Sequence, residues 1–369
     1  MFQYIVRRVL LFIPTLFFVT VISFGIIQMA PGDPAELKAG VGSEGAQRGN
    51  QQLNEQIIKQ IRAQWHLDKP IWYWSIFSDA KDSTGELKPL RDRIHFAWNG
   101  TNNQYHLWMG DLLHLNFGKS FQDQRPVIDK IMERLPITAT LALISEFLAF
   151  IIAIPIGIYS AAKQREGGKV DKSISTILFI LYSLPGFWVA TMLIIFFGGG
   201  DFLAWFPNNG IHGMDYPYPT WWANTGDLLW HIALPIVCYT YASLASLSRF
   251  MRASMLDVIR QDYIRTARAK GLSEKIVVYK HALRNSLIPI ITIIAGTLPA
   301  LIGGSFIIET IFSIPGLGLL GVSAVFARDY PIVLADFVIS SVLVLAGILL
   351  ADILYSVVDP RIAFSKRTG

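Results

Sequence analysis

Three glycines with the spacing of a dinucleotide-binding loop are the feature of this sequence that most directly suggests nucleotide chemistry. Gly316, Gly318 and Gly321 form the pattern G-x-G-x-x-G, and an acidic residue, Asp336, follows twenty residues after the first of them. A dinucleotide site needs this pattern between a strand and a helix of a soluble βαβ unit. Here apolar runs flank the pattern on both sides. We therefore expect a re-entrant or gate-supporting loop at this position.

Other patterns that carry out covalent chemistry are missing from the sequence. It contains neither the phosphate-binding pattern G-x-x-x-x-G-K-[ST] nor the zinc-binding pattern H-E-x-x-H. The single cysteine, Cys238, lies within an apolar run, so the chain forms no intrachain disulfide and no cysteine-based metal site. The histidines are scattered along the chain: His66, His95, His106, His114, His212, His231 and His281. We expect no catalytic residue, no metal and no cofactor, and without a phosphate-binding loop the chain is not expected to hydrolyse ATP itself.

A basic segment of about forty residues, 248–286, is a stronger candidate for function. It contains nine Lys and Arg residues and only three Asp and Glu residues. Such a loop can lie on anionic lipid headgroups, where each cation contributes about 1 kcal/mol, or it can dock a partner. Gly271 is expected to end a helix, because glycine tolerates a positive φ. Four residues lie on adjacent helical turns before it: Tyr263, Thr266, Ala267 and Lys270.

The elements that must position these residues are long and apolar. The chain has 369 residues, of which 52% are hydrophobic and 16% charged, and its mean hydropathy is +0.42. A helix needs about 20 residues to cross a hydrocarbon core of about 30 Å. Six runs reach about that length: Val9–Met29, Thr138–Tyr159, Ile174–Phe197, Leu228–Leu247, Leu287–Ile308 and Ile332–Val358. We predict an all-α polytopic membrane protein, in which the first run is retained as a membrane span.

The distribution of basic residues predicts the orientation of these spans. The loop 198–227 has no Lys or Arg, and the loop before the sixth run has only Arg328. Basic residues precede the first run, join the second to the third, and close the chain: Arg7, Arg8, Lys163, Arg165, Lys169, Lys172, Arg361, Lys366 and Arg367. By the positive-inside rule, both termini are cytoplasmic.

The loop between the third and fourth runs is rich in aromatic residues. Amphipathic rings favour the headgroup level of a bilayer, and we prefer an interfacial belt to a carbohydrate- or base-stacking site. Its members are Trp205, Phe206, Tyr216, Tyr218, Trp221, Trp222 and Trp230.

The span pattern divides the chain into four regions. Residues 1–30 hold the N-terminal end and the first span, and 31–137 form an external loop domain. Residues 138–358 form a five-helix core, and 359–369 a cytoplasmic tail. Charges in Pro31–Pro136 balance, with seven Lys and six Arg against eight Asp and five Glu, which is typical of a solvated domain. Within it, 52–65 has helical spacing of apolar residues, while 79–89 is polar and turn-rich.

Two residues inside the predicted spans are candidates for lining a solute pathway. Glu146 places a carboxylate at bilayer depth, where charged groups usually face a bundle interior or a wet cavity. A buried hydrogen bond to a neighbouring helix explains it equally well. For Asp336 and Asp352 we prefer the hydrogen bond or, for Asp352, an approach to the interface. Pro185 interrupts the third run, where proline can kink a helix and shape a cavity.

The order of residues in the basic segment resembles the EAA loop of importer permeases of the ATP-binding cassette class. The resemblance is strongest to the dipeptide, oligopeptide and nickel permease branch, and it covers nearly the whole chain. The blocks that carry it are Arg7-Arg8, Ala30–Pro34, Asn116–Ser120, Arg134–Thr138, Asp262–Gly271, His281–Leu283, Ser286–Pro289 and Glu309–Gly318. Two features depart from the family: the nominal Glu-Ala-Ala triplet is Arg265-Thr266-Ala267, and about 78–108 is longer than its usual outer loop.

The resemblance implies a type I importer permease fold of six transmembrane helices, with an enlarged external loop between helices 1 and 2. It implies a translocation pathway for peptides or similar small solutes, coupled to ATPase subunits through the loop 262–289. The implied coupling residues are Asp262, Tyr263, Arg265, Thr266, Ala267, Ala269, Lys270, Gly271, His281 and Pro289.

The resemblance also implies partners and a location. The partners are a second homologous permease subunit, two ATP-binding cassette ATPases, an external solute-binding protein and the lipid bilayer, with no nucleic acid. The location is the bacterial cytoplasmic membrane, and the chain itself is a transporter subunit and not an enzyme.

Two other classes of function remain open from the residues alone. An ion-driven secondary carrier needs intramembrane ionisable residues and often contains paired repeats; Glu146 is the one plausible coupling residue, and no repeat is visible. A membrane-embedded enzyme needs converging catalytic side chains, which we do not find. The solute also stays open, because the family branch includes carriers of peptides, nickel, glutathione and small sugars.

Overall fold

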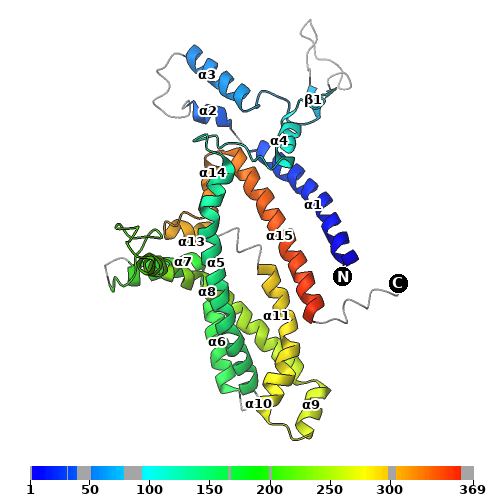
Figure 1. Cartoon of the computed structure of the whole chain (residues 1–369), viewed down its shortest axis with the longest axis vertical. Coiled ribbons are helices and arrows are strands. Elements are labelled where there is room, and N and C mark those ends of the chain that lie inside the picture. Colours follow the sequence, from blue (N-terminus) through cyan, green and yellow to red (C-terminus); the bar gives the residue numbers. More distant parts are fainter. Residues whose placement is uncertain are drawn as a thin grey trace. The chain divides into compact units, whose positions relative to one another are not determined.

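The computed structural model describes residues 2–30, 32–39, 51–78, 94–164, 168–198, 202–297 and 305–358. The described chain is mostly helical (Figure 1). It divides into two compact units, each described here by itself. Unit 1 comprises 1–14, 131–322 and 339–369, and unit 2 comprises 15–130 and 323–338.

Unit 1 contains most of the helices of the described chain. Of these, α1 and α14 continue into unit 2, and α5 and α15 begin there. In chain order they are α1 (Phe2–Gln28), α5 (Val127–Lys163), α6 (Lys169–Ser183), α7 (Gly186–Leu193), the π-helical η4 (Ile194–Gly198), α8 (Trp221–Ile259), α9 (Asp262–Ala269), α10 (Glu274–Ile276), the π-helical η5 (Val277–Ala282), α11 (Leu283–Thr297), α13 (Phe306–Ile311), α14 (Leu317–Phe326) and α15 (Tyr330–Val358).

Four helices of the described chain are long and apolar enough to cross a membrane. They are Ile5–Gln28 of α1, all of α5, all of α8, and Tyr330–Leu350 of α15. These helices contain most of the first, second, fourth and sixth predicted runs. Multiple membrane-spanning helices are therefore confirmed.

The third predicted span is not one straight helix. The structure ends α6 at Ser183 and starts α7 at Gly186, with a bend of 92° between the two helical segments. Pro185 explains the break, because proline disfavours helical geometry in the residue before it. Leu184 is accordingly extended, with ψ 127°. The prediction of a single kinked span was wrong in degree, and the pair forms a broken span or a re-entrant hairpin.

The fifth predicted span, 287–308, lies partly outside the described residues. Helix α11 covers its first part and ends at Thr297, and α13 begins at Phe306. Residues 298–304 are not among those described. The described residues thus contain four helices that are long and apolar enough to cross a membrane, or five such spans if the bent pair is one.

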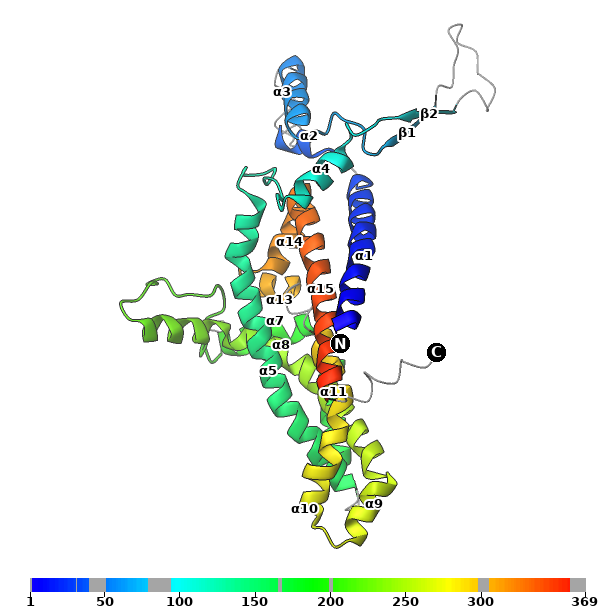
Figure 2. The ribbon, with the colours of Figure 1, turned by 45° about the vertical axis from the view of Figure 1, so that its right-hand side comes forward.

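Helix α8 is central to the packing of unit 1. It packs against both α6 and α11, and its buried Met251 and Met255 belong to a core shared with α5, α9 and η5. Gly157 allows α5 to lie close against α8, since a Cβ at this position would lie 2.6 Å from the Cβ of Met251. Both views show α9 and α10 at the ends of α8 and α11 (Figures 1 and 2).

Unit 2 contains the remaining elements: α2 (Pro34–Lys38), α3 (Gln51–Gln64), β1 (Trp74–Ser78), β2 (Ile94–Trp98) and α4 (Gln104–Leu113). Helix α3 confirms the helix predicted at 52–65. The antiparallel hairpin β1–β2, with Trp74 opposite Trp98, was not predicted and corrects the all-α class. The polar stretch 79–89 lies outside the described residues. An aromatic cluster of Phe24, Trp72, Tyr105 and Trp108 forms the interior of the unit.

Candidate functional site

The candidate docking surface consists of α9 and the turn that follows it. Helix α8 ends at Ile259, and Gln261, with φ −71° and ψ 151°, redirects the chain into α9. The helix ends before Gly271, whose φ of +77° is the left-handed conformation typical of a helix C-terminus. The predicted helix break at this glycine is confirmed. A Cβ on Gly271 would meet nothing within 4 Å, so its role within this chain is backbone conformation.

One face of α9 is buried and the other is free. Ile264 and Ala267 pack into the core with Val277, and Ala267 is only 7% exposed. The family resemblance implies that Ala267 is one of the coupling residues. Ala267 instead faces the core of its own chain, because residues three apart lie on the same side of a helix. The exposed face consists of Asp262, Tyr263, Arg265, Thr266, Ala269 and Lys270.

Polar contacts hold α9 to the elements after it. The guanidinium of Arg268 donates two hydrogen bonds to the carboxylate of Glu274, at 3.0 and 2.8 Å. At the other end of α9, Asn285 Nδ2 of α11 donates to the hydroxyl of Tyr263 at 2.7 Å. Both ends of this short helix are therefore fixed to α10 and α11, so a force on its exposed face would reach α11.

The last two predicted coupling residues lie in the elements that follow. His281 is half-buried in the π-helical segment η5, and Pro289 is exposed within α11. Between them, Ser286 joins α11 to α8: Ser254 Oγ donates to the Ser286 carbonyl at 2.9 Å. His281 and Pro289 thus lie in η5 and α11 and are not part of the exposed face of α9.

A buried ion pair connects α6 to α8. Arg252 donates from Nε and Nη2 to the two carboxylate oxygens of Asp171, at 2.5 and 2.6 Å. Ser160 of α5 donates to the same carboxylate at 2.5 Å. Asp171 is 4% exposed. Sequence reasoning missed this group, although an acidic residue between Lys169 and Lys172 was a usable signal.

The candidate pathway residues lie elsewhere in unit 1. Glu146 is half-buried in α5, and Pro185 caps α7 at the bend. Next to this bend, the Tyr241 hydroxyl donates to the Leu184 carbonyl at 3.1 Å. Asp352, for which we preferred a structural role, forms an ion pair with Arg8 Nε at 3.1 Å. The pair joins α15 to α1.

A carboxylate that sequence reasoning missed explains the glycine pattern at 316–321. Glu309 is fully buried, and its Oε2 accepts the Leu319 amide of α14 at 2.7 Å. Thr138 donates to Oε1 at 3.3 Å and accepts the Leu317 amide at 2.8 Å. The carboxylate thus satisfies the free amides at the start of α14.

The glycines give this carboxylate its space. A Cβ on Gly316 would lie 2.5 Å from the carboxyl carbon of Glu309, and one on Gly318 would lie 3.1 Å from its Oε2. The pattern that resembles a dinucleotide loop therefore fits an internal carboxylate. Gly316 lies in the turn between α13 and α14, and Gly318 and Gly321 lie in α14 itself. The re-entrant or gate-supporting role of this segment stays a prediction.

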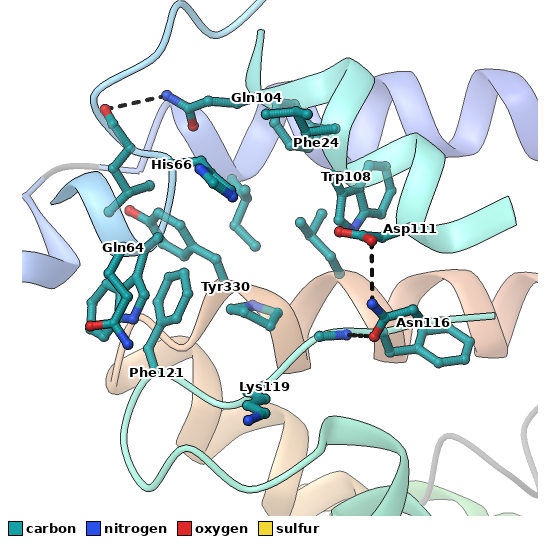
Figure 3. Close-up of a pocket in the computed structure, with 18 of the residues that line it drawn as sticks. Phe24, Gln64, His66, Gln104, Trp108, Asp111, Asn116, Lys119, Phe121 and Tyr330 are labelled. Carbon is teal, nitrogen blue, oxygen red and sulfur yellow. Dashed lines mark hydrogen bonds between the residues drawn. The ribbon is translucent and has the colours of Figure 1, made fainter. Parts of the chain in front are cut away.

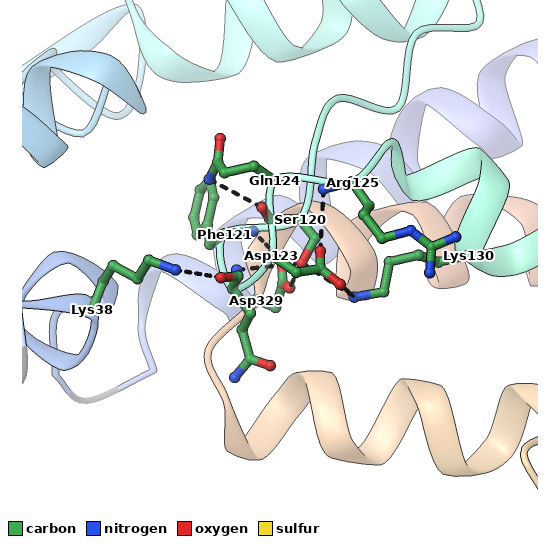
Figure 4. A network of polar contacts seen from close by, with 9 residues as sticks. Lys38, Ser120, Phe121, Asp123, Gln124, Arg125, Lys130 and Asp329 are labelled. Atoms are coloured by element: carbon green, nitrogen blue, oxygen red, sulfur yellow. Dashed lines mark hydrogen bonds and ion pairs between the residues drawn. The ribbon is translucent and has the colours of Figure 1, made fainter.

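In unit 2, a polar network connects the loop 116–126 to the turn before α15 (Figure 4). Ser120 Oγ and the Phe121 amide donate to the carboxylate of Asp329, at 2.5 and 2.9 Å, and Asp329 is 1% exposed. Lys130 donates to Asp123 at 2.8 Å. Burial alone would raise the pKa of Asp123, but hydrogen bonds from Lys130 and the Arg125 amide lower it from 3.8 to about 2.

The same unit contains a pocket of about 340 Å³ (Figure 3). Its walls are aromatic, with Phe121 stacked on Trp65 at a centroid distance of 4.0 Å. Asp111 lies at the pocket and accepts a hydrogen bond from Asn116 Nδ2 at 3.2 Å. The lining comes from five segments far apart in the sequence, which explains why sequence reasoning did not find it. Among the described residues, no group of three His, Cys, Asp or Glu side chains could hold a metal ion.

Comparison with known proteins shows which proteins this chain is similar to. Residues 153–364 match the family model described as "Binding-protein-dependent transport system inner membrane component". The chain is 39% identical over 365 residues to the oligopeptide transport system permease protein AppB of Bacillus subtilis (strain 168), covering 99% of this chain and 100% of that protein. It is 31% identical over 380 residues to the dipeptide transport system permease protein DppB of Escherichia coli (strain K12), covering 99% and 100%.

One solved structure shows the fold. A chain of the MetNI methionine ABC transporter, in inward-facing conformations, is similar with a TM-score of 0.50 and 19% identity. The match covers 63% of this chain and 97% of that chain. The matched part of this chain therefore shares the fold of that chain.

Proposed function

Because the chain belongs to the family of binding-protein-dependent transport system inner membrane components, we propose that it forms a solute pathway across the bacterial inner membrane and couples it to ATP hydrolysis through α9. The chain is an ATP-binding cassette importer permease and not an enzyme, and ATP is hydrolysed on separate subunits. The family excludes the alternative of an ion-driven secondary carrier.

The observation that best supports coupling through α9 is the combination of a free face and a fixed back. The exposed face of α9, from Asp262 to Lys270, is available to a partner. Its buried face and its bonds to Glu274 and Asn285 make it a stiff extension of α8 and α11. Closure of two nucleotide-binding subunits can move membrane helices only through such a stiff contact.

The proposed assembly has one further membrane subunit and three further proteins outside it. A second homologous permease completes the pathway, two ATPases dock on the cytoplasmic side, and an external binding protein delivers solute. The proposed chain has six crossings in a type I arrangement, with both termini cytoplasmic. Region 31–137 is the external loop domain, 138–358 the permease core, and 359–369 the cytoplasmic tail. Glu146 and Pro185 are proposed to line the pathway.

The proposed solute is a peptide or a similar small molecule. Two of the relatives are named for oligopeptide and dipeptide transport, and both match this chain over nearly its whole length. Uptake of labelled di- to pentapeptides by cells with and without the chain measures this directly.

A pull-down with mild detergent tests the coupling surface. The tagged chain is purified from its native cells, and co-purifying polypeptides are identified by mass spectrometry. We compare Ala269→Glu, on the exposed face of α9, with Ala223→Glu, an equally exposed alanine at the start of α8. Both substitutions add the same charge to a solvent-facing helix position, so a general effect of the charge is controlled.

We expect the unmodified chain and Ala223→Glu to retain a second permease and the ATPases. Ala269→Glu should retain the permease and lose the ATPases. Full retention of the ATPases by Ala269→Glu would remove α9 from the docking surface.

A further inference from the structure

A groove of about 620 Å³ between α6 and α8 has no role in the function proposed above. Phe179 and Tyr182 of α6 line one wall, and Phe250 of α8 lines the other. These rings are 59%, 58% and 58% exposed. Three large exposed rings on two facing helices make a surface that is poorly suited to water.

The groove also carries one uncompensated positive charge. Arg252 lines it but is neutralised by Asp171, as described above. Arg249, one turn earlier, lies 5.5 Å from the ring centre of Tyr182. Within the described part of the chain, Arg249 has this ring contact and no carboxylate partner. A ligand that fits the groove should therefore combine one anionic group with an apolar body.

The position of Arg249 along α8 indicates the depth of this charge. Trp230 belongs to the aromatic belt expected at the outer interface, and Arg249 follows it after nineteen residues of continuous helix. At 1.5 Å per residue this is about 28 Å, close to the hydrocarbon thickness of about 30 Å. Arg249 then lies at the level of the inner headgroups, on the side where Lys169 and Lys172 begin α6.

We propose that this groove binds an anionic phospholipid of the inner leaflet. The phosphate pairs with the guanidinium of Arg249, whose planar donors match phosphate oxygens. An acyl chain lies along Phe179 and Phe250. Basic pockets between membrane helices on the cytoplasmic side bind lipid headgroups in this way. The depth of Arg249 rests on the proposed orientation of the chain.

Two other occupants are less well matched. A transported solute must leave its binding site quickly. Three aromatic rings around an arginine would instead hold a bound ligand in the groove. A second permease would have to place a carboxylate at headgroup depth opposite Arg249. A lipid supplies both the charge and the apolar body in one molecule, at the depth where lipids already are.

Native mass spectrometry of the purified full-length chain tests the proposal. The chain is titrated with phosphatidylglycerol and, separately, with phosphatidylcholine of the same acyl chains. Variant Arg249→Gln removes the charge in the groove. The control is Arg260→Gln, an exposed arginine just after the end of α8. A second variant, Phe250→Ala, removes part of the apolar wall.

We expect the unmodified chain to prefer phosphatidylglycerol. Arg249→Gln should weaken that binding by about fivefold, corresponding to the loss of one cation near the headgroups, while Arg260→Gln changes it by less than about twofold. Phe250→Ala should weaken binding of both lipids. Equal phosphatidylglycerol binding by Arg249→Gln and the unmodified chain would overturn the proposal, as would no preference between the lipids.

The remaining outcomes separate this proposal from the function of the chain. If Arg249→Gln raises the KM for solute in neutral liposomes without changing lipid binding, the groove belongs to the pathway and the lipid proposal is wrong. If Arg249→Gln separates the two permeases and leaves lipid binding unchanged, the groove is a subunit interface and the proposal is equally wrong. A chain that purifies without ATPases yet shows lipid binding that depends on Arg249 would contradict the proposed function and leave the lipid site standing.

Discussion

A buried carboxylate with only neutral hydrogen-bond donors is the least expected residue of this chain. Glu309 is fully buried, and its described partners are the Leu319 amide and the Thr138 hydroxyl. Burial of a charge is costly unless its hydrogen bonds are complete. The cost of burying Glu309 is therefore kept low by the tight turn that brings the α14 amides to its carboxylate. That turn depends on Gly316.

Substitution of Gly316 by alanine should destabilise the protein through Glu309. The new Cβ would lie 2.5 Å from the carboxyl carbon, and moving the carboxylate would break its bonds to α14. We expect a loss of about 1–3 kcal/mol, measured as a lower midpoint of thermal unfolding in detergent. Gly226→Ala is the control: it lies in α8 with open space around it and should be neutral or slightly stabilising. Equal melting of the two variants would contradict this account.

Asp123 gives the protein a stability that depends on pH. Its pKa is lowered to about 2 in the folded state, from 3.8. A lowered folded pKa stabilises the protein above the unfolded pKa, and this contribution is lost as the pH falls from about 4 towards 2. Asp123→Asn should therefore lower the melting temperature at pH 6, and the difference from the unmodified protein should shrink towards pH 3. Asp262→Asn, at a side chain that is 95% exposed, should not change the melting temperature. A difference for Asp123→Asn that stays constant with pH would show that the Lys130 contact does not stabilise the fold.

At the scale of the element, α9 illustrates how two alanines two residues apart can have opposite roles. Ala267 is buried in the core and Ala269 is exposed. Ala267→Asp places an unpaired charge in an apolar core, where its cost is several kcal/mol. Ala269→Asp places the same charge in solvent.

We expect Ala267→Asp to lower expression and to aggregate on size-exclusion chromatography. Ala269→Asp should elute as a single folded species but lose solute-stimulated ATPase activity in proteoliposomes with the partner subunits. A well-folded Ala267→Asp protein would mean that α9 is not fixed to the core as described.

Local patterns predicted those elements whose stability is local. The amphipathic spacing of 52–65 predicted α3, and Gly271 predicted the end of α9. The size of the bend at Pro185 was not predictable, because a proline in a membrane helix can cause either a small kink or a complete change of direction. Hairpin β1–β2 was also missed, since each strand has only five residues in which polar residues interrupt the apolar ones, and so short a pattern does not distinguish a strand from a helix or loop.

The candidate site was predictable in its location and not in its orientation. The residue order identified α9, but burial of Ala267 depends on α5, α8 and η5 packing against it. The same limit applies to Asp171 with Arg252 and to Glu309 with Leu319. Each pair joins segments that are 81 or 10 residues apart, and only folding brings them together.

At the scale of the whole molecule, the charge distribution predicts the direction in which the chain crosses the membrane. The basic residues predict that the aromatic loop before α8 is external and that α9 and η5 are cytoplasmic. Met214 in this aromatic loop is fully exposed, and Tyr279 in η5 is 58% exposed. The native Cys238 is 2% exposed, and burial raises the barrier to its modification, so the background of thiol labelling should be low.

Single cysteines at these two positions should therefore label from opposite sides. Met214→Cys should react with a membrane-impermeant maleimide in intact spheroplasts, whereas Tyr279→Cys should react only after the membrane is permeabilised. The unmodified chain, which retains Cys238, is the control for background. Because the docking of ATPases requires α9 on the cytoplasmic side, the reverse labelling pattern would contradict both the orientation and the coupling role of α9. It would also place Arg249 at the level of the outer leaflet. The anionic lipid bound in the α6–α8 groove would then have to come from that leaflet and not from the inner one.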